Sequence, residues 1–273
     1  MKKIAVIITV FNRKNKTLNC LKNLFKQQLP NNWTIEVFLV NDGCTDGTPE
    51  AIQQFFPEVN IILGTGELFW NRGMHLAWDT ASKKDDYDFY LWLNDDTYLY
   101  KDALKMLIES SKLKNNQSII GGAVQSTNTG EMTYGGLINN KLSLPNGKLQ
   151  ECDTLHGNFI IVPRYVFQHV GNLDYHFRHA IGDLDYGLRA KKLGIKSFIA
   201  PDFVGSCEAN ETLPKWCLSE TPLLDRFRIL YSPLGYAEPI PFFIYEKRHF
   251  GLLTALKHFF SINLRALLPK LWK

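Results

Sequence analysis

The sequence lacks the motifs of several common nucleotide-binding and metal-binding proteins. It contains no G-x-x-x-x-G-K-[ST], which excludes a P-loop as written, and no G-x-G-x-x-G after its first apolar run, which disfavours a dinucleotide-binding domain. Its five cysteines form no C-x-x-C pair, and their odd number does not indicate a disulfide framework. We therefore expect free thiols in a reducing compartment, and no zinc ribbon.

Long hydrophobic runs are also absent. No uninterrupted apolar stretch reaches the ~18 residues of a transmembrane helix. The first apolar run, IAVIITVF, is short and is followed at once by NRKNK without a small-residue cleavage site, so we interpret it as a buried strand and not as a signal peptide. The 273 residues are 45% hydrophobic and 21% charged, a composition typical of globular proteins. We expect a cytoplasmic protein.

Acidic residues are missing from the carboxyl-terminal part of the chain. Six of the 31 Lys and Arg residues follow Glu246, whereas none of the 27 Asp and Glu residues does. The net charge of +4 therefore comes from this tail, while a nucleic-acid binder more often spreads basic residues over its folded domain. We expect no nucleic-acid partner.

Apolar runs typical of buried strands alternate with segments of helical periodicity. At Thr48, followed by Pro49 and Glu50, the pattern predicts a helix N-cap. Strands are expected at 4–10, 35–40, 59–63, 89–93, 119–125, 155–162 and 195–200, and helices at 17–28, 73–82, 101–114, 163–170 and 183–193. This order predicts an α/β fold with a Rossmann-like, mostly parallel central sheet flanked by helices. We divide the chain into a catalytic domain, 1–205, and a helical carboxyl-terminal extension, 206–273.

Polar residues follow four of the expected strands, at the edge of the sheet where open α/β folds bind ligands. These segments are TVFNR from Thr9, NDGCTDGT from Asn41, GTGELFWNRG from Gly64 and NDDT from Asn94. A nucleotide site without a phosphate-binding loop needs a metal ion to hold a diphosphate. Asp95 and Asp96 offer the oxygen ligands that Mg²⁺ and Mn²⁺ prefer.

Five motifs in this order and spacing resemble the inverting family 2 glycosyltransferases of the GT-A fold: TVFNR, NDGCTDGT, WNRGMH, LNDDT and GDLDYGLRAKKLG. The resemblance covers about residues 3–205. It implies transfer of a sugar from a nucleotide sugar, UDP in preference to dTDP, to a hydroxyl of a glycan or lipid-linked acceptor in cell-surface polysaccharide synthesis. The Gln-x-x-Arg-Trp motif of processive synthases is missing, which implies single additions.

The resemblance also implies roles for individual residues. Asp183 would be the general base, and Asp96 would bind Mn²⁺ or Mg²⁺. The residues that would contact the donor are Thr9, Phe11, Asn12, Arg13, Asp42, Asn71, Arg72, Gly73, Asn94 and Asp95. On the acceptor side we place His156, Gly157, His179 and Asp185.

Some features depart from the family pattern or have a simpler explanation. Gly182 stands where a Glu is common, and Asn94 replaces the first Asp of the D-x-D motif. No His appears in the segment directly after Ala200, where some relatives supply another metal ligand, although Cys207 or Glu208 lies near that place. Asp183 also suits a helix N-terminus. A catalytically silent nucleotide- or glycan-binding module of the same fold therefore remains an alternative.

The tail at 247–273 alternates apolar and basic residues. Such a pattern suits peripheral contact with the inner face of an anionic membrane, and it equally suits packing on the domain itself or on a partner subunit. The sequence leaves these alternatives open.

Overall fold

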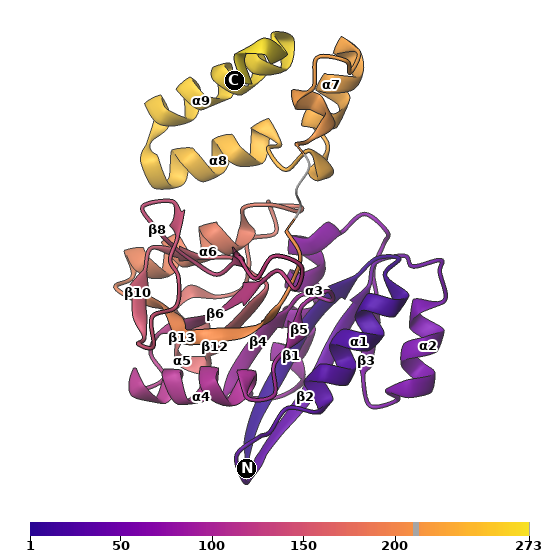
Figure 1. The fold of residues 1–273 in the computed structure, drawn as a ribbon, viewed down its shortest axis with the longest axis vertical. Helices are drawn as coiled ribbons and strands as arrows, with labels where there is room; N and C mark the ends of the chain where they lie inside the picture. Colours follow the sequence, from indigo (N-terminus) through magenta and orange to yellow (C-terminus); the bar gives the residue numbers. More distant parts are fainter. Residues whose placement is uncertain (210–212, 273) are drawn as a thin grey trace.

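A mostly parallel central sheet organises the protein (Figure 1). The computed structural model describes residues 1–209 and 213–272. The large sheet has the order β10-β13-β6-β12-β4-β1-β2-β3, with β5 beside β13 and β7 beside β6. Its strands are β1 (Lys2–Val10), β2 (Trp33–Asn41), β3 (Asn60–Leu63), β4 (Phe89–Leu93), β5 (Tyr98–Leu99), β6 (Ile119–Gln125), β7 (Met132–Tyr134), β10 (Gln150–Cys152), β12 (Phe159–Pro163) and β13 (Ser197–Ser206). One antiparallel strand, β12, is inserted between parallel strands, and β5, β7 and β10 pair antiparallel at the margins of the sheet.

Helices cover both faces of this sheet, and the carboxyl-terminal helices form a second layer beyond its edge (Figure 1). A small sheet contains β8 (Gly136–Ile138), β9 (Lys141–Leu142) and β11 (Thr154–Leu155). The helices are α1 (Lys14–Phe25), α2 (Thr48–Phe55), α3 (Phe69–Lys84), α4 (Ala103–Leu113), α5 (Arg164–Val170), α6 (Gly182–Lys192), α7 (Leu223–Leu230), α8 (Pro239–Phe250) and α9 (Leu252–Leu267), with short 3₁₀ turns η1 (Lys215–Cys217), η2 (Pro233–Gly235) and η3 (Pro269–Trp272).

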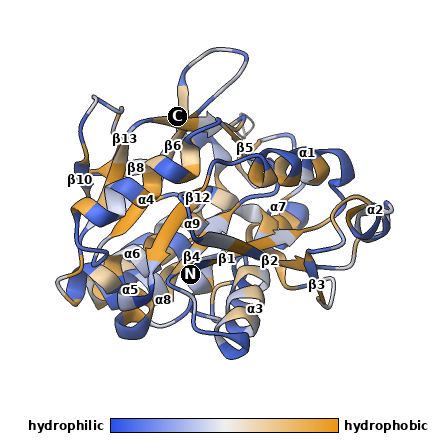
Figure 2. Ribbon diagram, turned by 90° about the horizontal axis from the view of Figure 1, so that it is seen from below, coloured by the Kyte–Doolittle hydropathy of each residue, from blue (hydrophilic) through white to orange (hydrophobic). Residues whose placement is uncertain are grey.

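Strand β1 shows why the sheet is buried on both faces. Its side chains alternate between the two faces with period two. Ile4, Val6 and Ile8 belong to the core that includes residues of α1 and α4, whereas Ala5 and Ile7 belong to the core that includes residues of α3 and α6. Figure 2 shows this burial: the central strands are coloured as hydrophobic, and the helices around them are more hydrophilic. The predicted α/β architecture is confirmed.

Several predicted elements differ in detail. The strand expected at 195–200 is β13, which continues to Ser206, and the helix expected at 17–28 is α1, which begins and ends three residues earlier. The expected strand at 155–162 is two strands, β11 and β12, separated by the segment 156–158, and β12 runs antiparallel to both β4 and β6. Thr48 is the first residue of α2 and not its N-cap, because Gly47 adopts the left-handed conformation (φ 77°) before it and Asp46 accepts a hydrogen bond from the Thr48 amide. Helix α3 begins four residues earlier than expected.

The carboxyl-terminal helices form a layer above α6, with α8 next to the domain and α9 outermost (Figure 1). Ion pairs join the two layers: Arg248 of α8 contacts Asp174 and Asp185, and Arg178 contacts Glu238. The predicted helical extension is therefore present, and α8 packs on the domain. Within the part of the chain that is described, no helix combines the length and the apolar character needed to cross a bilayer.

Candidate functional site

Two adjoining pockets lie where β1, β2 and β4 end. We call them the aromatic pocket, of about 360 Å³, and the acidic cleft, of about 380 Å³. They share five residues, so they form one continuous depression: Arg13, Trp70, Asp95, His179 and Leu234. The aromatic pocket adds Thr9, Phe11, Asp42 and Phe69, and the acidic cleft adds Asn94, Asp96, His156, Gly157 and Asp183.

Asp42 organises the wall of the aromatic pocket. It follows β2, is 3% exposed, and its carboxylate accepts hydrogen bonds from the amides of Gly66 (2.8 Å), Leu68 (2.9 Å) and Phe69 (2.9 Å). These bonds hold the segment between β3 and α3 against the end of β2. A Cβ at Gly64 would lie 2.7 Å from Asp42 Oδ1, which explains the glycine at this close approach.

Asp95 and Asp96 lie beside the guanidinium group of Arg13, which we predicted to contact the donor. Arg13 Nη1 lies 3.2 Å from Asp95 Oδ1 and 2.8 Å from Asp96 Oδ2, and Lys16 Nζ lies 3.9 Å from Asp96 Oδ2. Asp95 also accepts a hydrogen bond from Thr17. Burial raises the pKa of Asp95 to about 6; the Asp96 charge acts in the same direction and Arg13 opposes it.

Asp183 lines the same cleft and comes from a different element, α6. It lies in the first turn of α6, where its Oδ2 accepts a hydrogen bond from the Gly157 amide (2.8 Å) and its Oδ1 from the Leu184 amide (2.9 Å). Two backbone donors therefore fix the orientation of this carboxylate. A Cβ at Gly157 would lie 2.5 Å from the Trp70 ring, so glycine lets its amide reach Asp183.

Backbone strain gathers around the two pockets. Apart from asparagines, the described non-glycine residues with positive φ are Phe69 (56°), Ile181 (77°) and Tyr236 (59°). All three line the aromatic pocket or the acidic cleft. A positive φ is a genuine outlier for a β-branched residue such as Ile181, and strain of this kind concentrates at functional sites. It independently supports the assignment of this depression as the functional site.

Two histidines line the cleft in neutral form. Burial lowers the pKa of His156, although the Asp183 charge opposes the shift. Burial and the Arg13 charge lower the pKa of His179 to about 4, and its ring packs edge-on against Phe69 and Tyr236. Both can therefore donate and accept hydrogen bonds at neutral pH.

Four predicted residues support the site without lining it. Asn12 accepts a hydrogen bond from the Thr45 amide, and Gly73 gives α3 space beside Thr9, because a Cβ there would lie 2.2 Å from Thr9 Oγ1. Asn71 is fully buried and donates to the carbonyls of Asp174 and Phe177. Arg72 donates to the Tyr175 carbonyl and stacks on its ring. Asn71 and Arg72 thus anchor the segment that leads to Asp183.

The structure does not bring Asp185 to the acceptor side, and this expectation is corrected. Asp185 lies in the first turn of α6, two residues after Asp183, and is fully buried. Its oxygens accept from Arg189 (2.8 Å), Arg248 (2.7 Å) and His249 (2.8 Å). Asp185 therefore fastens α8 to α6, and it has no access to a substrate.

Sequence reasoning missed several aromatic or apolar contributors to the cleft, three of which come from segments far from the motifs. Tyr134 enters from β7, and Leu234 and Tyr236 come from the carboxyl-terminal region. None carries a local signal, because no motif surrounds it and its position depends on the folding of distant segments. Trp70 lines both pockets and donates from Nε1 to Asn94 Oδ1 (2.7 Å).

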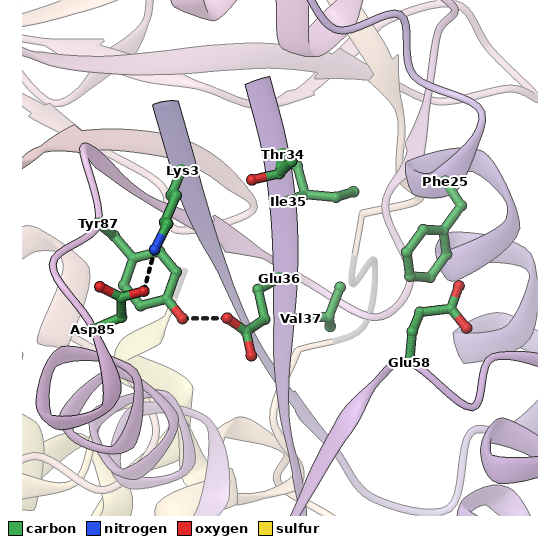
Figure 3. A pocket seen from close by; sticks show the side chains of 9 residues that line it. All are labelled: Lys3, Phe25, Thr34, Ile35, Glu36, Val37, Glu58, Asp85 and Tyr87. Carbon is green, nitrogen blue, oxygen red and sulfur yellow. Dashed lines mark hydrogen bonds and ion pairs between the residues drawn. The ribbon is translucent and has the colours of Figure 1, made fainter. Parts of the chain in front are cut away.

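A different pocket, of about 280 Å³, lies at the opposite edge, near the first residues of β1 and β2 (Figure 3). Its polar groups already have partners: Lys3 pairs with Asp85, and Tyr87 donates to Glu36. It also lies at the amino ends of the parallel strands, away from the edge where ligands bind in such folds. We therefore assign no function to it.

Asp96 and its surroundings fit a cation held largely by a ligand. Among residues 1–209 and 213–272, no three His, Cys, Asp or Glu side chains are grouped to hold a metal. The Cys207 thiol lies 3.7 Å from Asp96 Oδ1, but burial raises its pKa to about 12, so it stays protonated. Mg²⁺-type ions bind through one or two carboxylates plus substrate phosphates, and Asp96 with Asp95 matches that requirement.

Comparison with known proteins agrees with this geometry. Residues 5–181 match the model of "Glycosyl transferase family 2". Over 105 residues the chain is 29% identical to the glycosyltransferase GlyA of Streptococcus pneumoniae, and over 131 residues 25% identical to the poly-beta-1,6-N-acetyl-D-glucosamine synthase of Staphylococcus epidermidis. These alignments cover 38% and 43% of this chain but only 14% and 31% of those proteins.

Solved structures show the same fold. Residues 1–349 of S. aureus TarS, in complex with UDP, superpose with a TM-score of 0.55 at 17% identity, covering 92% of this chain and 72% of that one. The mannosyltransferase PcManGT of Pyrobaculum calidifontis, in complex with GDP-Man and Mn²⁺, gives 0.56 at 18% identity, covering 93% and 73%. The family match, which spans well over half of the chain, and the carboxylate-lined cleft at the expected sheet edge together show that this chain belongs to glycosyl transferase family 2 and has the GT-A fold.

Proposed function

We propose that the protein transfers a sugar from a nucleotide sugar to a hydroxyl of a saccharide acceptor, with a divalent cation and with inversion at the anomeric carbon. One observation carries the proposal: Asp96 and Asp183, far apart in the sequence, line the same acidic cleft. An inverting displacement needs charge stabilisation on the leaving group and a base on the opposite side of the reacting carbon.

The donor would place its base in the aromatic pocket and its diphosphate near Asp96. The pocket offers Phe11 and Phe69 as apolar walls, and Arg13 lies between it and the acids. We propose UDP as the preferred nucleotide and dTDP as an alternative. TarS in complex with UDP supports this choice, while PcManGT in complex with GDP-Man makes a guanine nucleotide a necessary comparison.

Asp96, with Asp95 beside it, would hold Mn²⁺ or Mg²⁺ against the diphosphate. The cation supplies Lewis-acid stabilisation of the charge that develops on the departing phosphate. Arg13 and Lys16, which contact Asp96, would be free to turn toward the phosphate oxygens once the carboxylates bind the cation. PcManGT, solved with Mn²⁺, supports a cation of this type.

Asp183 would accept the proton of the attacking hydroxyl. The amides of Gly157 and Leu184 hold its carboxylate in place, with both oxygens at fixed positions in the cleft. His156 and Tyr236 line the cleft near it and suit hydrogen bonding and stacking with a sugar ring. We propose a non-processive addition to a cell-surface polysaccharide or to its lipid-linked precursor, supported by the relative named as a polysaccharide synthase.

Titration calorimetry with UDP, GDP and dTDP, with and without Mn²⁺, tests the donor site. We expect UDP to bind at least tenfold more tightly with Mn²⁺, and the Asp96→Asn variant to lose this gain. Asp102→Asn, a change of the same type at an exposed carboxylate, is the matched control. Equal binding with and without Mn²⁺ would refute the metal assignment.

Proton NMR of the product with a soluble saccharide acceptor tests the reaction. The anomeric coupling should be opposite to that of the donor sugar. If UDP binds but no donor sugar is transferred or hydrolysed, the silent binding module becomes the correct interpretation.

A further inference from the structure

Helix α9 turns its larger apolar side chains outward. Ala255 and Ala266, on its buried side, are fully covered, whereas Leu253 is 83% exposed and Phe260 is 67% exposed. A helix whose role is to pack on its own domain normally directs its large apolar side chains inward. The side of α9 that faces away from the domain therefore requires another explanation.

The exposed side chains form one continuous surface. Along α9 they recur every three or four residues, so they lie on one side of the helix. An apolar groove of about 310 Å³ connects them to α8, with Ile240 (58% exposed) on its far side. We define the outer apolar surface by its exposed members: Ile240, Leu253, Leu256, Phe260, Leu264 and Leu267. In Figure 1, α9 lies on the far side of α8 from the sheet.

The charged residues of α9 and of the segment that follows it are all basic. Lys247, Lys257 and Lys270 are exposed, and no acidic residue follows Glu246, which is itself buried and paired with His258. Two copies of the chain meeting at this surface would bring like charges together. A sheet of anionic lipid headgroups complements both the apolar stripe and its basic flanks.

We propose that the outer apolar surface lies in the headgroup region of an anionic lipid bilayer and holds the protein at the membrane. Leu234 and Tyr236, in the same carboxyl-terminal region, line the acidic cleft. The carboxyl-terminal region therefore supplies both the docked surface and part of the lining of the cleft, which suits an acceptor presented at a lipid surface. The proposal stands on the exposed helix and its charges, and it does not depend on the transferase chemistry.

Flotation with vesicles of phosphatidylcholine containing phosphatidylglycerol tests the proposal with the full chain. We expect binding to these vesicles, little binding to phosphatidylcholine alone, and weaker binding as salt is raised from 0.1 to 0.5 M. Lys257→Gln combined with Lys270→Gln should weaken binding about 30-fold, since each basic group near such a surface contributes about fivefold. Phe260→Gln should weaken it about tenfold.

Matched controls separate the surface from general effects of charge and hydrophobicity. Leu113→Gln, at an exposed leucine of α4, and Lys101→Gln combined with Lys105→Gln should leave vesicle binding unchanged. Because the substituted positions are exposed, thermal unfolding should change little, and calorimetric UDP binding provides an independent check of the fold. Equal binding to neutral and anionic vesicles, or no binding at all, would overturn the proposal. So would a dimer in light scattering that Phe260→Gln dissociates, because the surface would then be covered by a second copy.

Discussion

Gly182, immediately before the proposed base, offers the sharpest test of how the site is built. An ideal Cβ at this position would lie 1.7 Å from Asn71 Oδ1 and 2.5 Å from Asn71 Cγ. Asn71 cannot easily move, because its amide donates to the buried carbonyls of Asp174 and Phe177, each at 2.8 Å. The same contact explains why this chain has no Glu at the position, where its family commonly has one.

We therefore expect Gly182→Ala to lower the free energy of unfolding by about 2–4 kcal/mol. Overpacking costs about 1–3 kcal/mol, and each buried carbonyl that loses its donor adds about 1–3 kcal/mol unless the site relaxes. Any shift of the first turn of α6 also moves Asp183, and misplacement by about 1 Å can cost 100-fold in rate. Urea unfolding and steady-state kinetics measure the two effects separately.

A matched control and a double-mutant cycle make this prediction specific. Gly187 lies in the same helix, and a Cβ there would meet its nearest atom at an ordinary 3.6 Å, so Gly187→Ala should stabilise the protein by up to about 1 kcal/mol. The Asn71→Ala change removes the two shortest contacts and leaves the Asn71 Cβ at 3.3 Å, so in this background Gly182→Ala should cost little. The coupling energy should then be about 2–3 kcal/mol. If Gly182→Ala is as stable as Gly187→Ala, or if the two changes at 71 and 182 are additive, the steric argument is wrong.

Three further predictions follow from the same geometry. Asp183→Asn should lower kcat by about 10²–10⁴-fold with UDP affinity unchanged; a rate within twofold of the native enzyme would place the base elsewhere. Arg248→Met should lower the free energy of unfolding in urea by about 3 kcal/mol, because it removes a partner from the fully buried Asp185, whereas the exposed Lys247→Met should not. Burial lowers the pKa of His179 to about 4, so between pH 4 and about 6.5 this histidine binds a proton in the unfolded chain but not in the folded protein. The free energy of unfolding is therefore highest, as far as this group is concerned, above pH 6.5, and it decreases as the pH falls toward 4. In urea unfolding, the native protein should lose free energy of unfolding between pH 7 and pH 4.5, and His179→Gln should make that loss smaller by about 1–2 kcal/mol, after allowance for the partial exposure of the ring. The same pH dependence in the variant and the native protein would contradict the buried environment assigned to His179.

Much of the fold could be predicted from local patterns. The strands at Phe89–Leu93 and Ile119–Gln125 have the predicted bounds, because a continuous apolar run buried on both faces of a sheet has a clear beginning and end. The residues that follow β1, β2 and β4 meet in one depression, as expected for parallel strands whose carboxyl ends lie at one edge. The motif order also identified the family correctly.

The expectations that failed concern residues whose role depends on distant partners. The segment around Gly157 interrupts a run that looks like one strand, because its amide binds Asp183 and its missing side chain admits Trp70. Asp185 lies only two residues from Asp183 and yet faces the opposite way, onto Arg248. Asn71 belongs to a predicted donor-binding motif, but its side-chain amide donates hydrogen bonds to the backbone of the segment before α6.

The sequence by itself determined the α/β architecture, the edge at which the site lies and the family of the protein, because apolar periodicity and the residues at strand ends are local properties of the chain. Only the tertiary structure decided which carboxylates face the cleft and which are buried in ion pairs, because that depends on how α3, α6 and α8 are rotated and docked. It also decided that α9 buries Ala255 and Ala266 and exposes its leucines and Phe260. An amphipathic pattern shows that a helix has two different faces, but only contacts with residues far along the chain determine which face is covered.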